Sequence, residues 1–158
     1  MYTVWLKESA YIKILEETIK WMPFETGGIL IGYWGPPNEI VVTDIVGPGP
    51  LAMHENDSFE PDHEYQVREI SKKYFNTNRT ETYLGDWHTH PNSSSYLSEK
   101  DKRTLKRIAD FKKARLKKPL MLVLGTHPFE LLAVIQQYGD TLFDKHNKEI
   151  IRCDLVVY

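Results

Sequence analysis

The sequence predicts a single α/β domain that spans residues 1–158. The first reason is that runs with the two-residue alternation of strands take turns along the chain with longer runs in which apolar residues recur every three or four positions, as in helices. The second reason is that no repeat, low-complexity tract or long linker divides the chain. At 158 residues it is also long enough to bury a core without disulfides.

The first half is predicted to open with a strand over residues 2–6, followed by a helix that begins at Ser9. The helix is indicated by apolar side chains at three- and four-residue intervals, namely Ile12, Leu15, Ile19 and Met22. Pro23 ends this helix. Residues 27–34 and 39–46 are rich in β-forming side chains and are separated by Gly-Pro-Pro-Asn, which predicts a hairpin.

A long loop is predicted from Gly47 to Phe59, because Gly-Pro-Gly-Pro at its start disrupts regular structure and polar residues follow. Pro61 and Asp62 are typical of a helix start. This second helix is predicted to end near residues 76–78. We expect its core-facing side chains to be Tyr65, Ile70 and Tyr74.

The second half is predicted to contain a central strand over residues 82–89 and a third helix over residues 98–117. Ser98 is a favourable N-cap for that helix. One stripe of the helix comprises Asp101, Leu105, Ile108 and Lys112, which places the aspartate near the inward edge. Three further strands are predicted over residues 119–125, 130–136 and 150–158.

The composition is that of an ordinary globular protein, with 41% hydrophobic residues, 27% charged residues and a formal charge of -2. This balance points to neither nucleic acid nor membrane as a partner. The single cysteine, Cys153, lies in an apolar alternating segment and is predicted to be a buried thiol. No leader or membrane-spanning run is evident, so we expect a cytoplasmic protein.

The most informative segment is Trp-His-Thr-His-Pro at residues 87–91. Side chains at i and i+2 of a strand point to the same face, so His88 and His90 can reach one metal ion. Asp101, a short distance downstream, supplies a third ligand. Two imidazoles and one carboxylate leave zinc a net positive charge and an open position at which water can be acidified.

With Glu25 and Ser98, this segment resembles the JAMM metalloproteases, also called the JAB or MPN domain. The pattern of that family is a glutamate, then His-x-His-Pro, a short loop and Ser-x-x-Asp. Glu25 stands before an apolar run, as the family's glutamate does, and seven residues separate His90 from Ser98, as the pattern requires. The likeness covers nearly the whole chain and is to the prokaryotic stand-alone branch.

The resemblance implies a JAB/MPN-type fold, a curved mixed β-sheet flanked by helices. It implies one zinc ion per chain on His88, His90 and Asp101, with Glu25 as acid and base and Ser98 as oxyanion donor. The implied reaction is hydrolysis of the amide bond after the C-terminus of a ubiquitin-like modifier, often a tail that ends in glycine. Ubiquitin-activating-like and conjugating-like enzymes, including those of bacterial antiviral conjugation systems, are the implied partners.

Two alternative functions are open. Part of the family has lost zinc and serves as a scaffold, although the five intact motif positions argue against this here. A DNA-associated role, suspected for bacterial relatives in the fold superfamily, would use the run of residues 100–118, which holds ten of the 20 lysines and arginines. That run is otherwise a solvated helix face or a surface for an acidic partner. Nucleic acid is the less favoured partner because the basic residues are not regularly interleaved with aromatic ones.

The neighbours of the two histidines have simpler expected roles. Trp87 and Thr89 point to the opposite face of the strand and are predicted to pack in the core. Asp86 lies on the face of His88 and is predicted either to orient a ligand histidine or to be a solvated acid at the strand edge. The remaining histidines are predicted to be loop or surface residues, namely His54, His63, His127 and His146.

Overall fold

The computed structural model describes residues 1–138 and 148–158. The first half of the chain forms β1 (Thr3–Leu6), α1 (Glu8–Trp21), β2 (Gly27–Gly35), β3 (Glu39–Val46), β4 (Met53–His54), β5 (Phe59–Glu60) and α2 (His63–Asn76). The second half forms β6 (Thr82–His90), α3 (Glu99–Asp110), a 3₁₀ turn (Lys112–Ala114), β7 (Leu120–Thr126), β8 (Phe129–Tyr138), β9 (Lys148–Arg152) and β10 (Asp154–Val157). The predicted α/β class is confirmed.

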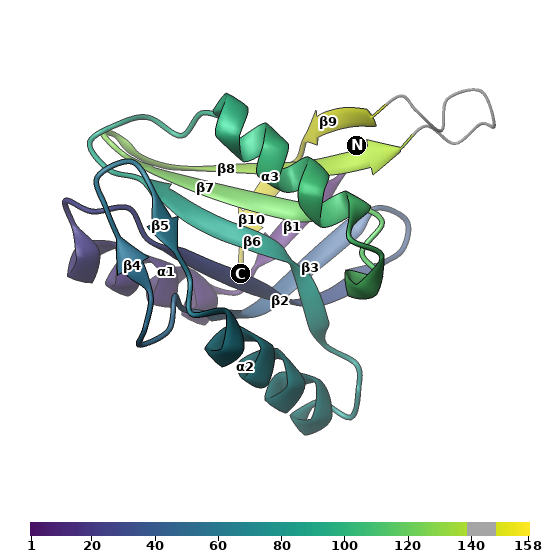
Figure 1. Cartoon of the computed structure of the whole chain (residues 1–158). Helices are drawn as coiled ribbons and strands as arrows, with labels where there is room; N and C mark the ends of the chain where they lie inside the picture. Colours follow the sequence, from purple (N-terminus) through teal and green to yellow (C-terminus); the bar gives the residue numbers. More distant parts are fainter. Residues whose placement is uncertain (139–147) are drawn as a thin grey trace.

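Eight strands form one curved mixed sheet in the order β10-β1-β3-β2-β6-β7-β8-β9 (Figure 1). The predicted hairpin of β2 and β3 is confirmed, and β6 is an interior strand, antiparallel to β2 and parallel to β7. His90, at the C-terminal end of β6, therefore lies between neighbouring strands and not on an edge strand of the sheet. The motif histidines are held by hydrogen-bonded neighbours on both sides.

The last segment, predicted as one strand over residues 150–158, is instead two strands that pair at opposite ends of the sheet. β9 pairs with β8, and β10 pairs with β1. The chain crosses over at Cys153, whose N–H donates to Ala133 O at 2.9 Å, while Asp154 N–H donates to Tyr2 O at 2.9 Å. The curved sheet is thus nearly closed. Cys153 is buried as predicted, and burial raises the pKa of its thiol to about 11.

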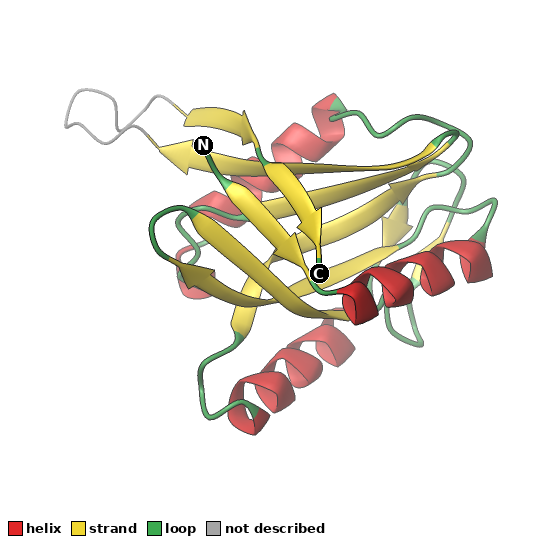
Figure 2. Ribbon diagram, turned by 180° about the vertical axis from the view of Figure 1, so that it is seen from behind, coloured by secondary structure: helices red, strands yellow, loops and turns green. Residues whose placement is uncertain are grey.

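The helices cover both faces of the sheet (Figure 2). α1 packs with the main apolar cluster, which includes Ile14, Leu30, Trp87 and Leu122. On the other face, Leu105 of α3 packs against Met121 and Val123, and side chains of α2 pack against Ile29 and Ile31. The face that carries α2 and α3 is the one on which the motif histidines lie.

The buried stripe of α1 differs from the periodic positions in the sequence. Ala10, Ile14 and Thr18 are buried, whereas Ile12 and Ile19 are exposed. Ala10, Ile14 and Thr18 follow one another at four-residue intervals and so lie on one side of the helix. This side packs close to β3 and is covered by the sheet.

Two helix predictions need correction. In α2, Tyr65 and Ile70 pack against the sheet as predicted, but Tyr74 is exposed beyond the edge of the contact. α3 ends at Asp110 rather than at residue 117, because Phe111 adopts extended backbone angles and a 3₁₀ turn follows. The basic run of residues 100–118 is therefore split between a helix, a turn and the approach to β7.

The predicted loop from Gly47 to Phe59 contains regular structure at its end. Met53 pairs with Glu60 and His54 with Phe59 in a small antiparallel hairpin, β4–β5. This hairpin lies beside the N-terminal end of β2 (Figure 1). Within the described part of the chain, none of the helices is long and apolar enough to cross a membrane.

Candidate metal centre

β6 presents His88 and His90 on one face, as the alternation of the strand requires. Their Nε2 atoms lie 3.2 Å apart. On the opposite face Trp87 and Thr89 are each 1% exposed, which confirms their predicted place in the core. Trp87 Nε1–H donates to Val46 O at 3.3 Å, so the strand is anchored from behind the site.

Asp101 reaches the histidines from the first turn of α3. Its carboxylate oxygens lie 2.9 Å from His88 Nε2 and 3.2 Å from His90 Nε2. Ser98 and Asp101 also form a capping box, in which Ser98 N–H donates to Asp101 Oδ2 and Asp101 N–H donates to Ser98 Oγ. The cap fixes the start of the helix and thereby the direction of the carboxylate.

Ligand atoms of His88, His90 and Asp101 all lie within 4.8 Å of one another, and among the described residues these three form the group that fits a metal ion. Burial alone favours neutral Asp101, but hydrogen bonds from the two imidazoles hold the pKa of its carboxyl well below its ordinary value. The carboxylate is therefore ionised and available as a ligand. The donor set and its convergence fit a bound divalent cation.

The pKa of His90 also responds to the surroundings of its ring. Burial opposes its protonation, but the hydrogen bond to Asp101 and the negative charges of Asp101 and Glu25 outweigh burial and raise the pKa of His90. A cation held by these residues would supply positive charge to the two carboxylates in place of that proton.

Glu25 is placed by the continuation of β2 beyond its first residue. Thr26 N–H donates to Thr89 Oγ1 at 3.0 Å, and Thr89 N–H donates to Thr26 O at 2.9 Å. These bonds hold Glu25 next to the end of β6. Its side chain is 9% exposed, and burial raises the pKa of its carboxyl against the opposing charges of His88 and Lys100. Glu25 stands beside the three-residue group without belonging to it.

Ser98 was predicted both to cap α3 and to donate to an oxyanion. The structure shows the cap, in which Ser98 Oγ accepts from Asp101 N–H at 3.1 Å. Because this bond uses a lone pair of the oxygen, the hydroxyl hydrogen is still available as a donor. The two predicted roles are compatible in one conformation.

Asp86 fits neither of its two predicted roles. It is half-buried rather than solvated, and its Oδ1 accepts from Tyr83 O–H at 2.7 Å rather than from a ligand histidine. A bulge at Leu84 in the pairing with β2 brings Tyr83 and Asp86 onto the same face. Burial raises the pKa of the Asp86 carboxyl.

Of the other histidines, His54 was assigned wrongly. It is half-buried, its ring stacks on that of Trp21, and its Nδ1 lies 2.9 Å from Glu25 O. No motif or period signalled this contact, because it depends on the path of the β4–β5 hairpin. His63 and His127 are exposed as predicted, and His146 lies outside the described residues.

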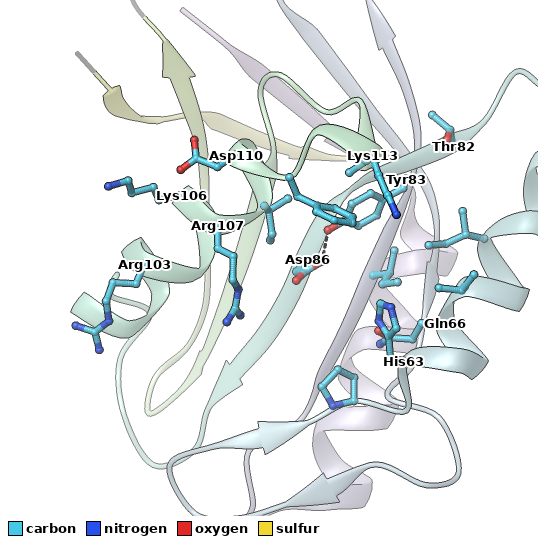
Figure 3. A pocket seen from close by; sticks show the side chains of 17 residues that line it. His63, Gln66, Thr82, Tyr83, Asp86, Arg103, Lys106, Arg107, Asp110 and Lys113 are labelled. Atoms are coloured by element: carbon cyan, nitrogen blue, oxygen red, sulfur yellow. Dashed lines mark hydrogen bonds between the residues drawn. The ribbon is translucent and has the colours of Figure 1, made fainter. Parts of the chain in front are cut away.

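A pocket of about 1150 Å³ lies between α2 and α3 and was not foreseen from the sequence. Its floor holds Tyr83 and Asp86, and its α2 side holds Gln66 and His63 (Figure 3). Basic side chains from α3 and the turn after it form the other side, namely Arg103, Lys106, Arg107 and Lys113. Four of the ten basic residues in the run of residues 100–118 thus line a concave surface, and these four are exposed to solvent as well.

Comparison with known proteins gives a consistent result. Residues 7–137 match the family model described as prokaryotic homologs of the JAB domain. A protein from Sinorhizobium fredii named "Probable metalloprotease" is 38% identical over 126 residues, 79% of this chain and 77% of that protein. An Enterobacter hormaechei protein named "CD-NTase/cGAS isopeptidase" is 28% identical over 146 residues, 89% of this chain and 78% of that protein.

A solution structure of a Desulfitobacterium hafniense protein has the same fold. It matches with a TM-score of 0.68 at 16% identity and covers 98% of this chain and 92% of that one. The family match spans most of the chain, and the named relatives are a metalloprotease and an isopeptidase. The chain therefore belongs to the prokaryotic JAB (JAMM) family and is, at the level of that family, an enzyme of the peptidase type.

Proposed function

We propose that this protein is a zinc-dependent isopeptidase that hydrolyses the amide bond between the C-terminal tail of a ubiquitin-like modifier and an amine of its target. The observation that carries the proposal is the convergence of His88, His90 and Asp101, with ligand atoms within 4.8 Å, beside the buried carboxyl of Glu25. A catalytically silent scaffold would have no need to keep these four groups together.

His88, His90 and Asp101 would hold the zinc ion, and one zinc per chain is expected. Two neutral donors and one carboxylate are the ligand set of hydrolytic zinc sites. When bound, zinc supplies a Lewis acid that polarises a carbonyl and lowers the pKa of a water molecule. The capping box at Ser98 and the neighbours of β6 keep the three ligands in place before the ion arrives.

Glu25 is the proposed proton carrier. As the water oxygen bonds to the carbonyl carbon, Glu25 takes up a proton of that water, and it then gives this proton to the nitrogen of the departing amine as the C–N bond breaks. Burial raises the pKa of Glu25, which brings its carboxyl closer to the pH at which a group can both accept and donate. Ser98 would donate its hydroxyl hydrogen to the carbonyl oxygen as negative charge develops there.

The pocket between α2 and α3 is the proposed seat for the body of the modifier. β6 carries both Asp86, on the pocket floor, and His88, and α3 carries both Arg103, on the pocket wall, and Asp101. The pocket thus shares these two elements with the metal site. Its apolar lining includes Ile29, Ile70 and Phe111, and its basic side chains fit acidic groups. We therefore propose a modifier with an apolar face edged by acidic residues.

The name of the Enterobacter relative supports an isopeptide as the bond that is cut. As the setting we propose a bacterial conjugation system with an antiviral role, in which activating-like and conjugating-like enzymes would make the conjugate. In this setting the leaving group is an amine of the conjugated protein, and the product is a modifier with a free C-terminal carboxylate.

The modifier tail is expected to need small terminal residues. The ring of Tyr96 lies 4.8 Å from that of His90, and the β4–β5 hairpin stands beside Glu25, so we expect these groups to restrict the path of the tail. In a matched series of modifier–lysine conjugates, replacing the last one or two residues of the tail with phenylalanine should lower kcat/KM by about a hundredfold. Intact-mass analysis measures the cleavage. Equal cleavage of small and bulky tails would contradict the proposed substrate class, even if zinc-dependent hydrolysis of other amides were found.

Charge reversal in the pocket should weaken substrate binding and spare the chemistry. Arg107→Glu is expected to raise KM for an acidic-faced conjugate by about tenfold with little change in kcat. Higher salt concentration should likewise raise the KM of the parent protein. Lys117→Glu changes the net charge equally at an exposed position outside the pocket and should leave KM unchanged. The same loss in both variants would show that overall charge, rather than the pocket, governs binding.

A further inference from the structure

The β4–β5 hairpin holds the main chain of Glu25 from both sides. Glu25 N–H donates to Glu55 O at 2.7 Å, and His54 Nδ1 lies 2.9 Å from Glu25 O. Because a carbonyl oxygen only accepts, His54 Nδ1 must carry the hydrogen. His54 and Glu55, which are consecutive in the hairpin, thus form hydrogen bonds with both backbone groups of Glu25, its C=O and its N–H.

The ring of His54 is fixed by its neighbours. It stacks on the ring of Trp21, with centroids 3.5 Å apart and planes at 12°, and it faces the ring of Phe59 at 6.1 Å. Its Nε2 is buried and makes no hydrogen bond within the described residues. The stacking therefore determines the ring orientation, and the one polar contact that the side chain makes with residues 1–138 and 148–158 is directed at Glu25.

The β4–β5 hairpin also contacts the start of β2 on one side and the start of α3 on the other. The ring of Phe59 lies over Gly27, where an added Cβ would come within 2.6 Å of two of its carbons, so the absence of a side chain there allows the contact. On the other side Lys100 Nζ donates to Asp57 O at 3.3 Å, which connects the hairpin to the first turn of α3. The hairpin spans from the Glu25 segment to the helix that carries Asp101.

No hydrogen bond to the Glu25 carboxyl is present within the described residues, so its position depends on its main chain. We propose that His54 is a positioning residue, which holds the Glu25 backbone so that its carboxyl faces the metal site. This inference rests on the proposed function for its effect on catalysis. The contact itself is a property of the fold and can be measured separately.

Two substitutions separate the ring of His54 from its hydrogen bond. His54→Phe keeps a ring that can stack on Trp21 but has no N–H, whereas His54→Asn keeps a donor close to the position of Nδ1 and loses the ring. We expect His54→Phe to lower kcat about five- to tenfold with unchanged KM and zinc content, and His54→Asn to retain most of the parent rate. His127→Phe, at an exposed turn, is the matched control and should behave as the parent protein.

The loss should act through Glu25. In a Glu25→Gln background, His54→Phe is expected to cause little further loss, because coupled residues are not additive. Independently of any activity, amide hydrogen exchange of Glu25 should become about tenfold faster in His54→Phe while that of Leu30, inside β2, is unchanged.

Three results would overturn the inference. They are parental kcat in His54→Phe, an equal fractional loss in the Glu25→Gln background, or unchanged exchange of the Glu25 amide. If the parent protein cleaves no conjugate, the proposed function fails, and the exchange measurement still decides whether His54 holds the Glu25 segment.

Discussion

Replacing either His88 or Asp101 by alanine is expected to remove most of the bound zinc and to lower hydrolysis by more than about a hundredfold. Each substitution leaves two of three ligands, and the buried side chains offer no nearby substitute, since these three alone among the described residues have converging ligand atoms. Asp101→Ala also removes one half of the capping box, so part of its effect is a less ordered start of α3. Elemental analysis of the purified variants measures the zinc content.

His127→Ala is the matched control for the loss of a histidine, because His127 is exposed at the turn between β7 and β8. It should keep about one zinc per chain. Asp101→Asn tests the capping box separately, since asparagine still has an oxygen that can accept from Ser98 N–H but lacks the charge. Full zinc occupancy in both His88→Ala and Asp101→Ala would show that the ligand set is wrong.

Glu25→Gln is expected to keep the zinc and lose the reaction. The amide has nearly the same size as the carboxyl but cannot carry a proton, so kcat should fall by roughly a hundredfold or more. Glu25 stands outside the group of ligand atoms, so zinc content should be that of the parent protein. Stability should rise slightly or stay level, because the variant no longer buries an ionisable group.

The control for Glu25→Gln is Glu16→Gln, which makes the same chemical change on an exposed position of α1. It should hydrolyse the conjugate at the parent rate. Loss of zinc from Glu25→Gln would place this residue among the ligands. An unchanged rate would remove it from the proton-transfer role.

Two parts of the site were predictable because each depends on residues that are close together in the sequence. Alternation along β6 fixes that His88 and His90 share a face, and Ser98 with Asp101 is a helix-start signal that the capping box confirms. Bringing Glu25 and Asp101 to the histidines is not local. The resemblance to the family supplied both placements. In this chain the pairing of β2 with β6 brings Glu25 to the histidines, and the start of α3 at Ser98 directs Asp101 toward them.

The parts that were missed depend on contacts between segments far apart in sequence. Cys153 divides the final strand because the chain moves there from β8 to β1, and no residue pattern near it records that exchange. His54 looked like a loop residue because its partners, Trp21 and Glu25, lie about thirty positions upstream. The pocket between α2 and α3 is formed by two helices whose individual patterns indicate only which faces are apolar.

The most direct test of a zinc centre on His88, His90 and Asp101 is a titration of zinc into the metal-free protein while cleavage of a modifier–lysine conjugate is followed by intact mass. Cleavage should be absent without metal, rise in proportion to added zinc and reach its plateau at about one equivalent per chain. The His90→Ala protein should give no such rise. Cleavage at the full rate by the metal-free protein, or by His90→Ala, would contradict the account.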